Sequence, residues 1–134
     1  IPCPLLVPLI EEGWLDHDVT RTVAATYLSA LKGTDVDTVI LGCTHYPLLS
    51  PILTVLLEEM LGGQVKVVDS ATAVASAVKL MLTNLGLSHS HGLGTQKFYV
   101  TDAPDRVASV AGQFWSVSTV DALHLEHIDL LDHS

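Results

Sequence analysis

The chain is poor in basic residues. Six Lys and Arg stand against 15 Asp and Glu in 134 residues, which gives a formal net charge of -9. A surface with this excess of negative charge repels phosphate backbones, so nucleic-acid binding is excluded as a leading function.

Long apolar runs are absent as well. No segment approaches the roughly 18 to 20 apolar residues that a membrane span needs. The first residues, IPCP, have neither the basic start nor the continuous apolar core of a signal peptide. We therefore predict a soluble, cytoplasmic protein with no membrane partner. Because the opening also lacks Met and reads like mid-protein sequence, we expect the chain to be a fragment.

Cysteine is scarce, and its spacing excludes two common uses. Cys3 and Cys43 make no disulfide framework, and an intracellular thiol is normally reduced. No CxxC or paired Cys/His spacing for zinc occurs. His89 and His91 lie in a Gly/Ser loop without Cys or carboxylate partners at ligand spacing, so solvated histidines are favoured over a metal site.

Apolar residues are plentiful at 49% of the chain, which is enough for a packed core in a chain of one-domain length. Their periodicity predicts helices and short strands in alternation, which favours an α/β fold with helices layered on a parallel sheet. The chain is expected to begin with an extended segment over residues 1–10 and a helix that Asp16 or Asp18 caps and that runs to about Lys32. The apolar face of this helix is predicted to consist of Val19, Val23, Tyr27, Leu28 and Leu31. The later expected elements are a strand over 38–42 buried on both faces, a helix capped by Ser50 that ends at Gly62, a strand over 65–68, a helix over about 71–85, a strand over 97–101, a helix from 103 to about 115, and a strand over 120–127. The Asp69-Ser70 pair is a natural cap for the third helix, with a substrate contact as the alternative.

Three chemically capable side chains follow the first strand directly. Cys43, Thr44 and His45 come after the apolar run TVILG, and Pro47 then prevents the strand from continuing. The carboxyl end of a parallel strand is a common place for a site in α/β proteins. There, backbone N–H groups and the dipole of the next helix favour a thiolate, which acts as a base or nucleophile.

Each of these side chains also has a structural interpretation. Cys43 is either a reactive thiol or a small buried hydrophobe. His45 is an acid, a charge partner or a hydrogen-bond donor, or else a histidine that caps local backbone. Thr44 either binds an anionic substrate or ends the strand.

The run LGCTHYPLL at residues 41–49 resembles the second-cysteine motif of the glutamate racemases, in the cofactor-independent aspartate/glutamate racemase superfamily. Three further runs resemble segments of that family: CPLLVPLIE at residues 3–11, VVDSA at 67–71 and FYVTD at 98–102. The resemblance covers nearly the whole chain and weakens after Trp115.

The resemblance implies a racemisation that uses two bases and neither pyridoxal phosphate nor a metal. One cysteine thiolate removes the α-proton of glutamate, and a second thiol on the opposite face returns a proton. Cys43 is then one of the pair, His45 assists it and Glu11 tunes the site, so these three form the catalytic set. Thr44 contacts substrate. The implied partner is glutamate, the implied role is D-glutamate supply for peptidoglycan, and a homodimer is the candidate assembly.

One departure from the family concerns the second thiol. The family's first catalytic cysteine precedes Asn-Thr, and no such segment occurs here, while Cys3 precedes Pro and matches a non-catalytic cysteine. The chain therefore resembles the C-terminal half only. By the family's connectivity, residues 1–63 belong to the second domain and residues 64–134 return to complete the first. We expect such a fragment to be inactive alone and to expose apolar surface and sheet edges.

Two alternatives stay open. The first is an aspartate racemase of the same superfamily, although that branch usually carries Glu where His45 stands. The second is a non-catalytic amino-acid-binding or regulatory module that keeps the fold.

Overall fold

The computed structural model describes residues 1–89, 97–114 and 125–129. The chain divides into two compact units, Ile1–Ser88 and His89–Ser134. Within the described residues, no helix is both long and apolar enough to cross a bilayer.

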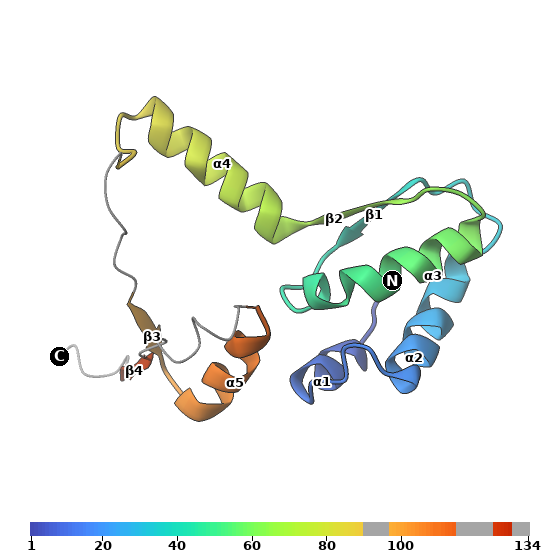
Figure 1. Cartoon of the computed structure of the whole chain (residues 1–134), viewed down its shortest axis with the longest axis horizontal. Helices are drawn as coiled ribbons and strands as arrows, with labels where there is room; N and C mark the ends of the chain where they lie inside the picture. Colours follow the sequence, from blue (N-terminus) through green and yellow to red (C-terminus); the bar gives the residue numbers. More distant parts are fainter. Residues whose placement is uncertain (90–96, 115–124, 130–134) are drawn as a thin grey trace. The chain divides into compact units, whose positions relative to one another are not determined.

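The first unit alternates helices with two parallel strands. Its elements are, in order, α1 (Leu6–Glu11), α2 (Asp18–Leu28), the short 3-10 helix η1 (Ser29–Leu31), β1 (Thr38–Leu41), a second 3-10 helix η2 (Tyr46–Leu49), α3 (Ser50–Leu61), β2 (Lys66–Asp69) and α4 (Ser70–Asn84) (Figure 1). Strands β1 and β2 pair in parallel, with Thr38 opposite Lys66 and Leu41 opposite Asp69. The predicted α/β class with parallel strands is confirmed.

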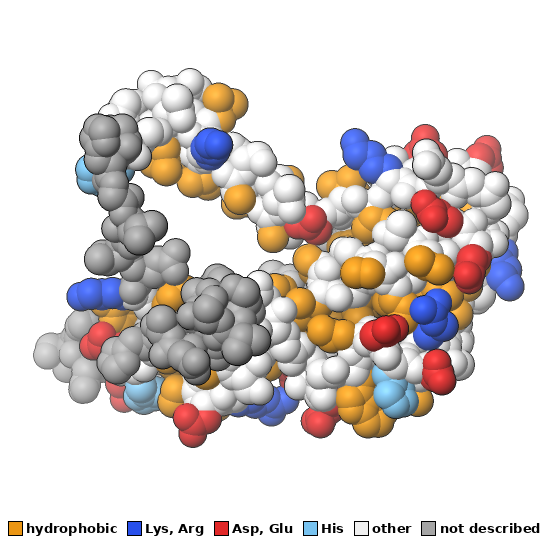
Figure 2. All heavy atoms as spheres, in the orientation of Figure 1, with side chains coloured by type: hydrophobic (Ala, Val, Ile, Leu, Met, Phe, Trp, Pro, Cys, Tyr) orange, Lys and Arg blue, Asp and Glu red, His pale blue; other side chains and the backbone are white. Residues whose placement is uncertain are grey.

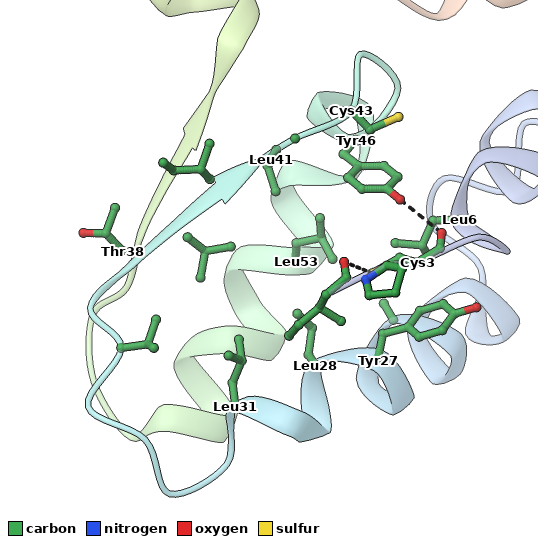
Figure 3. A pocket seen from close by; sticks show the side chains of 17 residues that line it. Cys3, Leu6, Tyr27, Leu28, Leu31, Thr38, Leu41, Cys43, Tyr46 and Leu53 are labelled. Carbon is green, nitrogen blue, oxygen red and sulfur yellow. Dashed lines mark hydrogen bonds between the residues drawn. The ribbon is translucent and has the colours of Figure 1, made fainter.

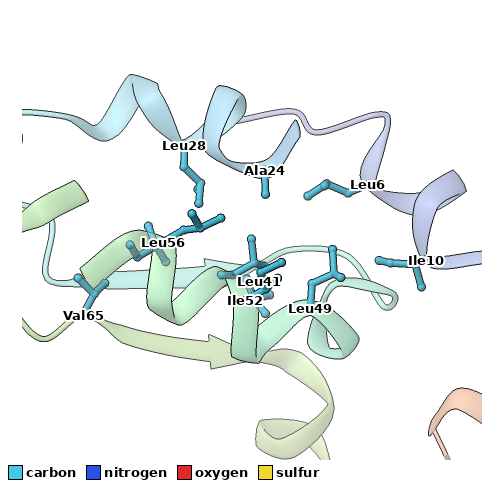
Figure 4. Packing of buried hydrophobic residues seen from close by; sticks show 11 residues of the cluster. Leu6, Ile10, Ala24, Leu28, Leu41, Leu49, Ile52, Leu56 and Val65 are labelled. Carbon is cyan, nitrogen blue, oxygen red and sulfur yellow. The ribbon is translucent and has the colours of Figure 1, made fainter. Parts of the chain in front are cut away.

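The core of the first unit lies among α1, α2, α3 and β1. Helices bury residues that recur every three or four positions, as Ala24 and Leu28 do in α2, because these positions share one face. The cluster consists of Leu6, Ile10, Ala24, Leu28, Leu41, Leu49, Ile52, Leu53, Leu56, Leu57 and Val65 (Figure 4). Since Leu41 and Leu49 both belong to it, the loop that joins β1 to α3 is anchored at each end.

The second unit contains β3 (Phe98–Val100), α5 (Pro104–Phe114) and β4 (Leu125–His127). Strands β3 and β4 are also parallel, with Phe98 opposite Leu125. The predicted strand and helix over 97–115 are therefore confirmed in type. Residues 120–124 of the predicted last strand lie outside the described residues, as does His91.

The N-terminal prediction was wrong. Residues 1–10 were expected to be extended because Pro2, Pro4 and Pro8 interrupt them, yet Leu6–Glu11 is α-helical. Pro8 is the third residue of that helix, and the first four N–H groups of a helix have no partner within it. The missing N–H of Pro8 therefore costs no helical hydrogen bond.

Helix α2 differs from its prediction in its cap, its end and one residue of its buried face. His17 caps it, since its Nδ1 accepts a hydrogen bond from the Val19 N–H at 3.1 Å, so neither Asp16 nor Asp18 does. The α-helix ends at Leu28 and gives way to η1 before Lys32. Val19 of the predicted apolar face is 42% exposed, but Leu28 is buried and Val23, Tyr27 and Leu31 pack against the core as expected. Thr20 and Ala24 are buried beside them.

The elements after the first strand fit their predictions more closely. Gly62 ends α3 in the left-handed conformation, at φ 72, as Gly was expected to do, whereas Leu49 and not Ser50 stands at the cap position. Asp69 caps α4 as predicted. Strand β1 was expected to be buried on both faces, but Ile40 is 73% exposed because no described element covers that side chain.

Helix α4 buries none of its residues. Its exposed large apolar side chains, together with Leu85 and Leu87 just beyond it, are Val74, Val78, Leu80, Met81, Leu82, Leu85 and Leu87 (Figure 2). Apolar side chains of a helix normally pack against a neighbouring element.

Candidate active site

The loop between β1 and α3 carries the three side chains that the sequence singled out. Strand β1 ends at Leu41, and η2 begins at Tyr46. Two backbone hydrogen bonds close the turn: Tyr46 N–H donates to the Cys43 carbonyl at 3.3 Å, and Leu48 N–H donates to the His45 carbonyl at 3.1 Å. Cys43 therefore lies where the sequence placed it, after the carboxyl end of a parallel strand and before a helix.

His45 lies between a hydroxyl and a carboxylate. Its Nε2 is 3.6 Å from Oε1 of Glu11, and its Nδ1 is 3.4 Å from Oγ1 of Thr44. Glu11 is the last residue of α1, so two segments distant in sequence meet here. Polar groups beside both ring nitrogens restrict how the imidazole turns.

The His45 and Glu11 side chains are 26% and 27% exposed. Water therefore reaches the pair, and a pair of this kind adds little to stability. Its contribution is to orient the imidazole.

Cys43 carries a free, half-buried thiol. It stands at the edge of a cavity of about 510 Å³ that also reaches Cys3 (Figure 3). The other lining residues are Ile1, Pro2, Leu6, Ala24, Tyr27, Leu28, Leu31, Val36, Thr38, Val39, Ile40, Leu41, Gly42, Tyr46 and Leu53. None of these described residues has a charged side chain, so the lining offers no cationic side chain to a dicarboxylate.

Cys3 has a different environment from Cys43. Burial raises the pKa of the Cys3 thiol, and the neighbouring N-terminal charge opposes this shift. The thiol donates to the carbonyl of Ile1 at 3.5 Å. A thiol kept neutral in this way is a poor base.

Sequence reasoning missed Tyr46. Its hydroxyl donates to the Cys3 carbonyl at 3.1 Å. Burial of the ring raises the pKa of the Tyr46 hydroxyl above its ordinary value. The hydroxyl therefore stays protonated and remains a donor. No local sequence pattern predicts this hydrogen bond, because its two partners are 43 positions apart.

Asp69 lies at the same end of the two-stranded sheet as Cys43, opposite Leu41. Its carboxylate accepts from Thr72 N–H at 2.8 Å and from the Thr72 hydroxyl at 3.0 Å, and these two bonds lower its pKa. These contacts are those of the helix cap that the sequence predicted. Among the described residues, no group of three or more His, Cys, Asp and Glu side chains is placed to hold a metal ion.

Several known proteins named glutamate racemase are similar to this chain. The glutamate racemase of Chlorobaculum parvum is 42% identical over 120 residues, and that of Syntrophus aciditrophicus is 44% identical over 113 residues. The chain is similar to the glutamate racemases over most of its own length. These two alignments cover 89% and 84% of this chain, but only 43% and 40% of the two proteins. No protein-family model matches the chain.

Solved glutamate racemases have the same fold. The enzyme of Thermus thermophilus, in complex with beta-chloro-D-alanine, superposes with a TM-score of 0.79 at 32% identity. That of Francisella tularensis, in complex with D-glutamate, gives a TM-score of 0.77 at 30% identity. Each match covers 96% of this chain and 46% of the solved one.

The predicted resemblance to the glutamate racemases is therefore confirmed. The chain spans less than half the length of these relatives. That extent agrees with the expectation that it corresponds to one half of the family fold.

Proposed function

We propose that this chain is part of a glutamate racemase, a polypeptide that interconverts L- and D-glutamate by two proton transfers and without a cofactor. The observation that carries the proposal is the Cys43 loop at the carboxyl end of β1, with His45 3.6 Å from Glu11. It occurs in a chain that aligns with glutamate racemases over 89% of its length. Both relatives compared are named for glutamate, which favours this substrate over aspartate.

In this mechanism Cys43 serves one face of the α-carbon. Its thiolate takes the α-proton of one enantiomer, and a thiol on the opposite face gives a proton to the resulting carbanion. For the other enantiomer the roles reverse, so that each turnover moves one proton onto one sulfur and one proton off the other. Opposite faces require two groups, and one thiol cannot serve both.

His45 and Glu11 act on the Cys43 side of the site. The imidazole is positioned by the Glu11 carboxylate at 3.6 Å, and it serves Cys43 as a proton partner or as a nearby charge. Thr44, whose side chain is exposed beside the imidazole, contacts the substrate.

The second thiol comes from another part of the full-length polypeptide. Cys3 is a poor candidate, because burial raises its pKa and its thiol donates to the Ile1 carbonyl. The chain alone is therefore inactive. In the complete protein, residues 1–63 belong to the second domain and residues 64–134 complete the first. It works in the cytoplasm, supplies D-glutamate for peptidoglycan and assembles as a homodimer.

Solvent-deuterium exchange at the α-carbon tests this function. The full-length protein is incubated in heavy water with D- or L-glutamate, alongside its Cys43→Ser and Cys3→Ser variants. We expect exchange from both enantiomers in the wild type and in Cys3→Ser. In Cys43→Ser, exchange from one enantiomer falls by about 100-fold or more, which assigns the face. Unchanged exchange in Cys43→Ser, or wild-type turnover of aspartate and not glutamate, overturns the proposal.

A further inference from the structure

His45 and Tyr46 are consecutive residues of the Cys43 loop, the segment between β1 and α3, and they contact opposite ends of α1. The Cys3 carbonyl accepts the Leu6 N–H at 3.1 Å, beside the first residue of α1, and it also accepts the Tyr46 hydroxyl at 3.1 Å. At the other end, Glu11 meets His45. Figure 3 shows the Tyr46 ring directed at the Cys3 backbone, with the hydrogen bond as a dashed line.

Helix α1 needs such contacts. It has six residues, and isolated helices shorter than about 12 to 15 residues are marginal in water. Its inner face packs through Leu6 and Ile10, which are 2% and 0% exposed. Because apolar packing is non-directional, it resists small movements of the helix along the core only weakly. A directional hydrogen bond at the start of the helix opposes such a shift.

We propose that Tyr46 is a positioning residue of the active site. By holding the start of α1 against the Cys43 loop, its hydroxyl sets where Glu11 arrives opposite His45 and how the loop presents the Cys43 thiol. This role rests on the proposed racemase function. In this role Tyr46 acts through the loop and α1, and not on the reacting atoms directly.

Tyr27 provides a matched control. Its hydroxyl accepts the Leu5 N–H at 3.3 Å, so it ties the same segment to α2. Since α2 carries none of the Cys43 loop, the Tyr27 contact holds α1 to the core without linking it to the thiol.

The test compares Tyr46→Phe and Tyr27→Phe in the full-length protein. Each variant keeps the ring and removes one hydroxyl. We expect Tyr46→Phe to lower kcat for glutamate by about ten-fold with KM within about two-fold, because misplaced catalytic groups slow the chemical step. Tyr27→Phe should keep kcat within about two-fold of wild type by the same reasoning. A wild-type kcat in Tyr46→Phe overturns the proposal.

A double-mutant cycle with Glu11→Gln separates positioning from general destabilisation. If Tyr46 acts through the Glu11 and His45 pair, the double variant should be as active as the less active of the two single variants. Losses that multiply show that Tyr46 acts independently of this pair, and they overturn the proposed route.

Alkylation of Cys43 by iodoacetamide gives a readout that does not depend on racemisation. The modified residue is identified by peptide mass spectrometry, which distinguishes Cys43 from Cys3. We expect Tyr46→Phe, and not Tyr27→Phe, to change the Cys43 rate by about three-fold or more, since thiol reactivity follows its surroundings. A rate equal to wild type overturns the positioning role. If the wild type does not racemise glutamate but the alkylation rate of Cys43 still changes in Tyr46→Phe, the proposed function fails, and only the influence of Tyr46 on the Cys43 thiol stands.

Discussion

At the scale of single residues, the candidate site is a set of polar contacts around one imidazole. Thr44 lies beside one ring nitrogen of His45 and Glu11 beside the other. The side chains of His45 and Glu11 are about a quarter exposed, so solvent screens their attraction. The contact between Glu11 and His45 therefore orients the imidazole, and its loss should change the reaction rate more than the stability.

Glu11→Gln in the full-length protein tests that view. We expect kcat to fall by about ten-fold, since the amide keeps the shape of the side chain but not its charge. The free energy of unfolding should change by less than about 1 kcal/mol, as for other exposed pairs. Racemisation kinetics and denaturant unfolding measure the two effects. Glu12→Gln, at the exposed next position, is the control. Equal rates in the two variants would remove Glu11 from the site.

At the scale of elements, local capping and packing set where each helix begins and ends. Gly62 takes the left-handed conformation at the end of α3, and Asp69 caps α4 with two bonds to Thr72. Both were predictable, because each depends on neighbours within a few residues. Helix α1 was not predictable in this way, since its stability depends on the burial of Leu6 and Ile10 against distant elements.

The Asp69 cap gives α4 a pH dependence. Hydrogen bonds from Thr72 lower the pKa of Asp69 in the folded chain. A lowered pKa contributes stability that is present above the unfolded value, near about pH 4, and is lost as the pH falls through the lower folded value. Circular dichroism of the full-length protein during acid titration should therefore show less loss of helix in Asp69→Asn than in wild type. Identical titration curves would contradict the assignment.

At the scale of the whole molecule, much apolar surface has no described neighbour. Ile40 on β1 is 73% exposed, and Leu80 on α4 is 62% exposed. The exposed large apolar side chains of α4 lie between Val74 and Leu82. Surfaces of this kind normally pack against further chain, and the chain spans less than half of its named relatives.

The isolated 134-residue chain should consequently be marginally stable and form oligomers or aggregates. It should also show no glutamate racemisation, because it presents one suitable thiol. Size-exclusion chromatography with light scattering, thermal melting and a racemase assay check these expectations. A monomer that melts in one sharp two-state transition would refute the stability prediction. Racemisation by the isolated chain would refute the need for a second half.

The sequence by itself determined which polar side chains follow the first strand, and it determined most of the local structure. An apolar strand, then Cys43, Thr44 and His45, then Pro47 and a helix could be predicted because backbone preferences and caps act over a few residues. Tertiary packing alone decided that Glu11 ends a helix beside His45 and that Tyr46 bonds to a carbonyl 43 positions away. The physical reason is that these contacts form only when segments distant in sequence pack together in one core.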